Sequence, residues 1–363
     1  MRKVLKSLPI ALVLAIVFQP VFGGNSDRAG QAGATELLIN PWARSSGFGS
    51  ANTASARGLE AQFLNVAGMA FTEKTEVLFT NTQWLVGSGV MINSFGVSQK
   101  IGEAGVLGLS IMNMSFGDIE ITTTDVPDGG IGTFSPNYLN IGLSYAKSFS
   151  NSINGGLTVR VINQNIQNLS ATGVAFDAGV SYTTRLGSKD KPKNKDNLQF
   201  GIALKNVGPP MKFSGDGLGV RGTVPGGDRS LTLEYRAAQY EMPSSLHIGA
   251  TYHWRNATLM HQVSGAVNFT SNSFTRDLMN FGLEYSFKNL FMLRGGYVLQ
   301  LGSDGPDDDV AISALTGPTA GVTVNVPLTK KGSEKKSTLG IDYSFRSTNP
   351  FSGVHAIGVR IAL

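Results

Sequence analysis

The sequence has 363 residues, of which 41% are hydrophobic and only 15% are charged. It contains no cysteine, which excludes disulfides, thiol nucleophiles and zinc–thiolate sites, and no run of its mature part reaches the roughly 20 apolar residues of a membrane helix. The formal net charge of +5 includes three basic residues of an N-terminal leader, so it gives no indication of nucleic acid binding.

The N-terminus is typical of a secretory signal peptide. Arg2, Lys3 and Lys6 precede an apolar stretch at residues 8–22, and Gly23 ends a small-residue cleavage site. We therefore assign residues 1–23 to a signal peptide that is removed on export. An uncleaved anchor is the alternative, although the apolar stretch is short for a spanning helix.

Residues 24–72 show no strand-like alternation. Short helices are predicted at 35–40 and 53–65, and the segment carries apolar residues such as Leu37, Trp42 and Phe63. We expect this segment to fold back into the lumen of the domain that follows and to act as a hatch or plug. A disordered periplasmic tail is the alternative.

From residue 73 to 363 the chain alternates between large apolar and small polar residues. Leu139, Ile141 and Leu143, for example, share one face, whereas Asn140 and Gly142 share the other. About fourteen antiparallel strands are predicted, at 75–84, 89–101, 105–117, 138–149, 153–164, 173–184, 198–207, 245–254, 261–270, 278–287, 290–298, 319–326, 337–346 and 354–363.

The polar face consists mainly of Gly, Ser, Thr, Asn and Ala rather than Lys and Glu. This composition favours an all-β transmembrane barrel, with lipid outside and an enclosed interior, over a soluble sandwich. We therefore expect an exported protein of the cell outer membrane, with the lipid bilayer as its first partner.

The predicted connections alternate between short and long. The inner turns fall near 102–104, 150–152, 185–197, 255–260, 288–289 and 327–336, and the outer loops at 85–88, 118–137, 165–172, 208–244, 271–277, 299–318 and 347–353. Short inner turns and long outer loops are typical of outer-membrane barrels. Aromatic residues are predicted at both rims, and two lysine-rich turns, 189–195 and 330–336, lie on the inner side as solubilising turns or as a patch for an acidic periplasmic partner.

The strand at 105–117 is less regular, because apolar residues occupy both of its faces. One face of the strand carries Leu107, Leu109 and Ile111, and the apolar residues that follow lie on the opposite face. This change of face predicts a bulge or kink here. The second set would face the lumen and contact a hydrophobic ligand; it comprises Met112, Met114 and Phe116.

No catalytic or cofactor motif is present, so we expect a protein that is not an enzyme and uses no cofactor. The four histidines are scattered, and we interpret them as lumen-facing packing residues; they are His247, His253, His261 and His355. One acidic group in an outer loop could supply oxygen ligands to calcium or form a solvated loop tip; it comprises Asp304, Asp307, Asp308 and Asp309.

The segment before the first strand resembles the opening of the PorV/PorQ family. The matching residues are Ala43, Arg44, Gly47, Phe48, Gly49, Asn65, Ala67 and Gly68, and the stretch 205–209 resembles a mid-barrel element of the same family. Phe48 stands where methionine is common in the family, and Val66 stands where proline is common.

This resemblance implies a fatty-acid-transporter-like barrel with fourteen strands and an N-terminal hatch. It also implies a role in the type IX secretion system of Bacteroidota, in which such proteins bind the C-terminal signal domain of secreted proteins and pass it from the translocon to the attachment machinery.

Our leading hypothesis is thus secretion or cell-surface attachment, with docking through the loops at 208–244 and 299–318. The alternative is a channel for fatty acids or other hydrophobic molecules, and a membrane enzyme is a third reading without a motif behind it. An open apolar pocket beside Met112 would favour transport, whereas a tightly packed interior there would favour secretion.

Overall fold

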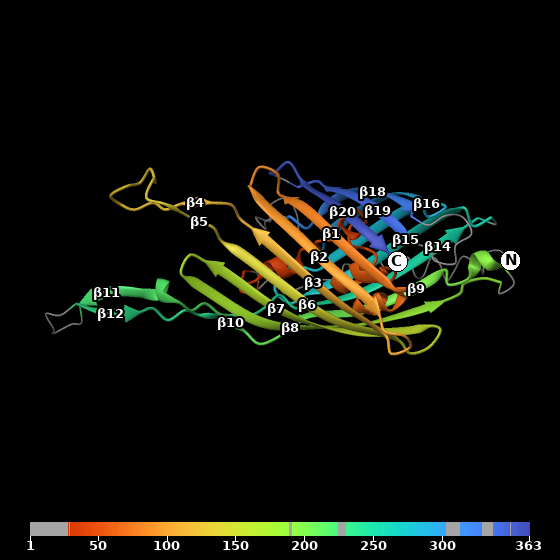
Figure 1. Ribbon diagram of the computed structural model, residues 1–363, viewed down its shortest axis with the longest axis horizontal. Helices are drawn as coiled ribbons and strands as arrows, with labels where there is room; N and C mark the ends of the chain where they lie inside the picture. The colour runs from red at the N-terminus through yellow and green to blue at the C-terminus, as the bar shows by residue number, and fades with distance from the viewer. Residues whose placement is uncertain are drawn as a thin grey trace.

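Fourteen antiparallel strands close into a barrel, in which β1 pairs with β20, in this computed structural model (Figure 1). The structure describes residues 28, 30–188, 191–223, 230–256, 258–302, 313–328, 337–348 and 350–363, so the expected signal peptide lies outside the described residues. The wall strands are β1 (Thr75–Trp84), β2 (Val90–Lys100), β3 (Val106–Ser115), β6 (Asn137–Ser148), β7 (Ile153–Ile166), β8 (Leu169–Thr184), β9 (Leu198–Val207), β14 (Ser245–Arg255), β15 (His261–Asn272), β16 (Leu278–Phe287), β17 (Phe291–Gln300), β18 (Gly317–Pro327), β19 (Thr338–Arg346) and β20 (Val354–Ala362).

The number and order of the predicted strands are confirmed. The clearest difference is at the connection between β7 and β8, which was predicted at 165–172 and is reduced to residues 167–168. The two strands stay paired beyond the predicted ends because polar side chains contact each other across the pair. Asn163 Nδ2, for example, donates to Thr172 Oγ1 at 2.9 Å. Polar pairs of this kind carry no apolar alternation that the sequence would reveal.

Side chains alternate between the two faces of the wall. In β6, Leu143 is 58% exposed on the outside, whereas Ser144 is 1% exposed and faces the lumen. In β9, Ile202 and Ala203 show the same contrast at 54% and 2%. The outside is therefore an apolar belt and the inside is lined by small polar residues, as in barrels that lie in lipid.

Two rim clusters interrupt this apolar belt. They consist of His261, Tyr285 and Phe287 at the inner rim and of Tyr343, Phe345 and His355 at the outer rim. In each, the histidine Nδ1 lies 2.8 Å from the tyrosine Oη, and the histidine and phenylalanine ring centroids lie 5.1 and 5.0 Å apart. The prediction of lumen-facing histidines is therefore wrong for His261 and His355, whose rings occupy the interfacial positions that aromatic side chains favour.

Strand β3 runs without the predicted bulge, since it pairs with β2 and β6 in unbroken register. Met112 and Met114 continue the inward face, so the apolar residues on both faces reflect an apolar lumen rather than a slip. The register shift of the wall lies instead between Phe176 and Ala178 of β8, opposite β9.

Two small two-stranded sheets, β4–β5 and β11–β12, reach well beyond the wall at one end of the barrel (Figure 1), and a third, β10–β13, packs at this end with Met211 in the apolar core. The three pair β4 (Ile119–Glu120) with β5 (Thr133–Phe134), β10 (Met211–Lys212) with β13 (Gln239–Tyr240), and β11 (Gly219–Thr223) with β12 (Ser230–Glu234); η7 (Asp216–Leu218) precedes β11. The opposite end carries the short turns and η6 (Pro192–Asn194). By the usual asymmetry of such barrels, the end with the long connections is the outer end.

Residues 30–72, named here the lumen segment, lie inside the barrel against inward-facing residues of the wall. Their helices are η3 (Thr35–Leu38), α2 (Ala43–Gly47), η4 (Gly58–Phe63) and η5 (Val66–Phe71). The sequence predicted η3 and η4 but not α2 and η5, because α2 has no apolar periodicity and η5 begins directly after the end of the helix predicted at 53–65. None of the helices in the described ranges is long and apolar enough to cross a bilayer.

Candidate functional site

Hydrogen bonds join the lumen segment to strands on several sides of the barrel. In each, a polar side chain donates to a backbone carbonyl of the segment or of the wall. They run from Gln62 Nε2 to Gly142 O (3.1 Å), from Asn65 Nδ2 to Val180 O (3.0 Å), from Lys205 Nζ to Phe63 O (2.5 Å), from Asn280 Nδ2 to Gly49 O (2.7 Å) and from Thr319 Oγ1 to Gly47 O (3.2 Å).

The first motif of the segment surrounds α2, where backbone meets backbone. A Cβ added to Gly47 would lie 2.9 Å from the Cα of Gly321 on β18, so only glycine fits there without a shift. Gly49 adopts a φ of +66°, which glycine alone adopts without strain, and packs against Gly296 of β17. The motif residues at 43–49 thus allow the segment to approach the wall closely.

The second motif forms the turn into η5. The Asn65 side chain accepts a 3.2 Å bond from the Ala67 backbone N–H and so caps the helix. A Cβ on Gly68 would lie 2.0 Å from the Ala56 carbonyl oxygen, so a larger residue cannot occupy this position. The structure therefore gives both motifs a place in docking the segment, at two separate points of the lumen.

An ion-pair network holds α2 against β16 and β17. Arg44 Nη2 lies 3.9 Å from Glu284 Oε2, which also accepts a 2.7 Å bond from Arg294 Nε. Burial alone would lower the pKa of Arg44, but Glu60, Glu284 and two further carboxylates raise it above its ordinary value. Arg44 is therefore a fixed positive charge at the contact between segment and wall.

A second network holds η4 against β7 and β8. Arg160 Nε donates to Asp177 Oδ2 at 2.7 Å, and both side chains are almost fully buried. The Arg160 guanidinium lies 4.1 Å from the centroid of the Phe63 ring, and its Nη2 donates to Gln62 O at 2.9 Å. Removal of either charge would leave the other buried and unpaired.

The residues expected to contact a hydrophobic ligand lie in an apolar cluster with the lumen segment. Met112 and Met114 are 1% and 4% exposed and belong to one core with Trp42 and Phe63, and Phe116 packs at the edge of this core. In this conformation the lumen segment covers them, as in the tightly packed interior that we associated with secretion. Their contact with a ligand stays a prediction.

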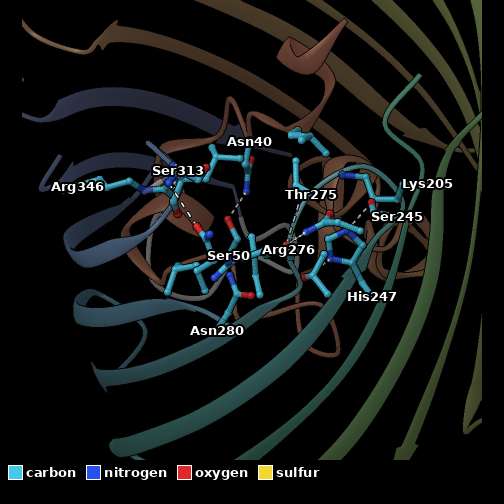
Figure 2. A pocket seen from close by; sticks show the side chains of 17 residues that line it. Asn40, Ser50, Lys205, Ser245, His247, Thr275, Arg276, Asn280, Ser313 and Arg346 are labelled. Carbon is cyan, nitrogen blue, oxygen red and sulfur yellow. Dashed lines mark hydrogen bonds between the residues drawn. The ribbon is translucent and has the colours of Figure 1, made fainter. Parts of the chain in front are cut away.

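A cavity of about 350 Å³ lies elsewhere in the lumen, between the lumen segment and β9, β14–β17 and β19 (Figure 2). Leu38 and Asn40 line it from the segment, and Leu278 adds an apolar patch from β16. Lys205 and Arg346 lie at opposite sides of it in Figure 2. No carboxylate belongs to its lining, so the cavity is positively charged.

The polar groups of this cavity determine what it could bind. Arg346 Nη1 donates to Leu315 O at 3.1 Å, and Asn280 Oδ1 is buried without a hydrogen-bond partner among the described atoms. An apolar patch beside basic side chains suits a small molecule with an apolar body and an anionic or hydrogen-bonding head.

Ser245 and His247 also border the cavity, and their Oγ and Nε2 atoms lie 3.1 Å apart. The other ring nitrogen of His247 lies 3.1 Å from Thr270 Oγ1 rather than from a carboxylate. A hydroxyl does not stabilise a protonated imidazole as the acid of a catalytic triad does. We therefore interpret this pair as part of the polar lining.

The described part of the structure adds no candidate to the calcium ligands that the sequence suggested. Within the described ranges, no group of three His, Asp or Glu side chains could hold a metal ion. The calcium candidates Asp304, Asp307, Asp308 and Asp309 lie outside the described residues. The sequence analysis did not predict the cationic cavity, because its lining residues come from six strands that are spread along the chain. Basic residues on the polar faces of strands, such as Lys205, were the feature of the sequence that could have indicated a charged lumen.

Comparison with known proteins gives two findings. Residues 24–226 match the family model described as type IX secretion system protein PorV. The toluene transporter TodX of Pseudomonas putida matches at a TM-score of 0.54 and 13% identity, over 89% of this chain and 97% of that chain. A TodX deltaS2S3 mutant, a monoaromatic hydrocarbon channel, matches at 0.53 and 12%, over 88% and 97%. At such identities the likeness shows the fold alone, and no curated protein sequence matches the chain significantly.

Proposed function

Since the chain belongs to the PorV family of type IX secretion system proteins, we propose that it binds secreted cargo or translocon partners at its outer end, without covalent chemistry. The protein is an outer-membrane β-barrel, so its outer connections are the parts that such partners can reach. The observation that carries the proposal is the shape and chemistry of the hairpin β11–β12.

This hairpin has one apolar and one polar face. Val220 pairs with Leu233, and Leu231 extends the same face, whereas Arg221 pairs with Thr232 on the other. Val220, Leu231 and Leu233 are 41%, 51% and 43% exposed. Its two strands pair with each other and not with the wall.

An isolated two-stranded hairpin is marginally stable in water, and a projecting apolar face is typical of a protein-binding surface. A partner that covers the face would stabilise the hairpin as well as gain affinity. We therefore place the docking surface on the connection 208–244. The connection 299–318, our second docking candidate, includes residues 303–312, which lie outside the described residues.

The test is a double change of Leu231→Asp and Leu233→Asp on the apolar face, with Thr232→Asp on the polar face as the matched control. We expect the double variant to reach the outer membrane at normal levels but to lose co-purified translocon or cargo proteins, while the control keeps them. Equal recovery of partners with both variants would argue against docking through this face.

The cavity supports a second function, passage of a small hydrophobic molecule. Its apolar patch and cations would hold an amphiphilic anion, and the lumen segment would then have to move to open a path. Proteoliposomes should take up labelled decanoate faster than protein-free liposomes, and Arg346→Gln should slow this uptake. Uptake equal to that of empty liposomes would remove the transport proposal and leave the secretion proposal untouched.

A further inference from the structure

We propose that the inner mouth of the barrel holds a binding site for an acidic polypeptide segment of a periplasmic partner. The site is a second cavity, of about 320 Å³, at the end opposite the hairpin β11–β12. It is therefore independent of the docking surface proposed above.

Four basic side chains from four different elements line this cavity. They are Arg57 of the lumen segment, Lys195 after η6, Arg255 at the end of β14 and Lys288 in the turn between β16 and β17. Asp196 is the single carboxylate among the lining residues, so the cavity carries a formal charge of +3. Like charges brought together in this way attract an anion from solution.

Contacts within the site hold two of these cations in place. Arg255 Nη1 donates to Lys195 O at 2.7 Å, and its Nε donates to Gln262 Oε1 at the same distance. The Arg57 guanidinium lies 4.4 Å from the centroid of the Phe71 ring. Partial desolvation in the narrow mouth, followed by the like charge of Arg255, lowers the pKa of Arg57. Arg57 and Arg255 are thus held by contacts with the fold, and the exposed Lys195 and Lys288 line the same cavity.

The direction in which the cavity opens excludes lipid as the occupant. Gln262 and Ser286 project from the inward faces of β15 and β16, and Arg57 belongs to the lumen segment. The cavity therefore opens into the mouth of the lumen and not toward the apolar belt. Its occupant must come from the aqueous space at the inner end.

The lip of the cavity favours a polypeptide over a free small anion. Leu259 and Met260 are 50% and 39% exposed there, and Pro192 lies beside them. The Asn289 side chain, whose Oδ1 already accepts a 3.2 Å bond from Ser286 Oγ, adds an amide N–H donor that suits a peptide carbonyl. Carboxylates of an acidic peptide would pair with the four cations, and its apolar side chains would cover Leu259 and Met260. Inorganic phosphate could pair with the cations but could not cover the apolar side chains.

The experiment uses the full-length protein in detergent and a fluorescein-labelled, end-blocked peptide, Leu-Glu-Glu-Leu-Glu-Glu, with its Leu-Gln-Gln-Leu-Gln-Gln counterpart. Fluorescence anisotropy should show binding of the first peptide only, and the affinity should fall as salt is raised. Arg57→Gln and Lys288→Gln should each weaken binding by about fivefold. Lys100→Gln, an exposed cation of the same end on β2, should leave it unchanged.

Three results would overturn the proposal. One is equal binding of the Glu and Gln peptides, and another is unchanged affinity in both Arg57→Gln and Lys288→Gln. The third is saturable binding of inorganic phosphate at the site without binding of the acidic peptide. Circular dichroism of each variant establishes that the barrel is folded, and Lys288→Gln, in a surface turn, provides a test that does not disturb the lumen segment.

Discussion

Glycine positions decide how closely the lumen segment approaches the wall. Gly47 meets Gly321, and Gly49 meets Gly296, with no side chain between the two backbones. This geometry accounts physically for the small residues of the motif at 43–49. The small residues of this motif are therefore needed for the lumen segment to pack against the wall.

Gly47→Ala tests this contact, because the new Cβ would lie 2.9 Å from the backbone of Gly321. We expect overpacking to weaken docking by about 1–3 kcal/mol. Limited proteolysis should then cut the lumen segment faster, whereas Gly265→Ala, whose Cβ would meet nothing within 4 Å, should behave as the parent. Equal protection of the two variants would mean that the segment adjusts without cost.

The buried pair of Arg160 and Asp177 provides a second test. Arg160→Met leaves the Asp177 carboxylate unpaired inside the barrel, and we expect a loss of about 3–5 kcal/mol in stability against denaturant. Adding Asp177→Leu should recover part of the loss, since the unpaired carboxylate is removed, although the buried Lys205 nearby then loses the attraction of Asp177. A single variant as stable as the parent would show that water reaches this pair.

Glu60 gives the docking of the lumen segment a pH dependence. Burial raises the pKa of its carboxyl above the ordinary value of 4.5, although Arg44 opposes the shift. The docked state therefore binds this proton more tightly than the free segment. Docking is favoured below pH 4.5 and loses this contribution as the pH rises through the docked-state value.

Glu60→Gln removes this titration. We expect hydrogen–deuterium exchange of residues 58–63 to become less dependent on pH above about 4.5 in the variant than in the parent. Glu73→Gln, at an exposed position before β1, should keep the parental profile. Identical profiles for Glu60→Gln and the parent would remove the role assigned to this carboxyl.

At the scale of elements, the wall strands could be predicted because lipid on one side and a small-residue lumen on the other impose a period of two. The outer hairpins could not, since all are short, β11–β12 is solvated on both faces, and Met211 of β10 enters the apolar core only through tertiary contacts. The bulge predicted in β3 was wrong because Met112 and Met114 face an apolar part of the lumen, which the sequence alone cannot distinguish from a slip.

The candidate site could be predicted only in part. The motif residues were found because they are close in sequence, and Met112 and Met114 because they interrupt the polar face of their strand. Lys205 and His247 lie on the paired strands β9 and β14, and Arg346 of β19 joins them only in the closed barrel, so no spacing in the chain indicates the cavity. The same holds for Arg57, Arg255 and Lys288 at the inner mouth.

The hairpin β11–β12 should be dispensable for the barrel, because its strands form a sheet of their own. Replacing residues 219–234 with a short Gly-Ser turn should therefore leave the thermal unfolding of the barrel unchanged, measured by circular dichroism. Excising residues 137–148, which form β6 of the closed wall, is the contrasting change and should prevent folding. A large loss of stability on removal of the hairpin would show that it supports the wall.

At the scale of the whole molecule, one closed wall separates three environments. Its exterior is apolar, its lumen is occupied by residues 30–72, and its two ends differ in chemistry. An apolar hairpin face projects at the outer end, whereas basic side chains gather at the inner mouth. Secretion, transport and the acidic partner all depend on the same premise, that the apolar face of each strand meets lipid.

The absence of cysteine allows this premise to be measured directly. Single cysteines at Leu143 and Ile202, and at their inward neighbours Ser144 and Ala203, can each carry a nitroxide spin label in lipid vesicles. Relaxation by oxygen, which concentrates in lipid, should be strong at 143 and 202 and weak at 144 and 203. Strong relaxation at 143 and 202 by a water-soluble nickel complex instead would contradict a lipid-facing wall.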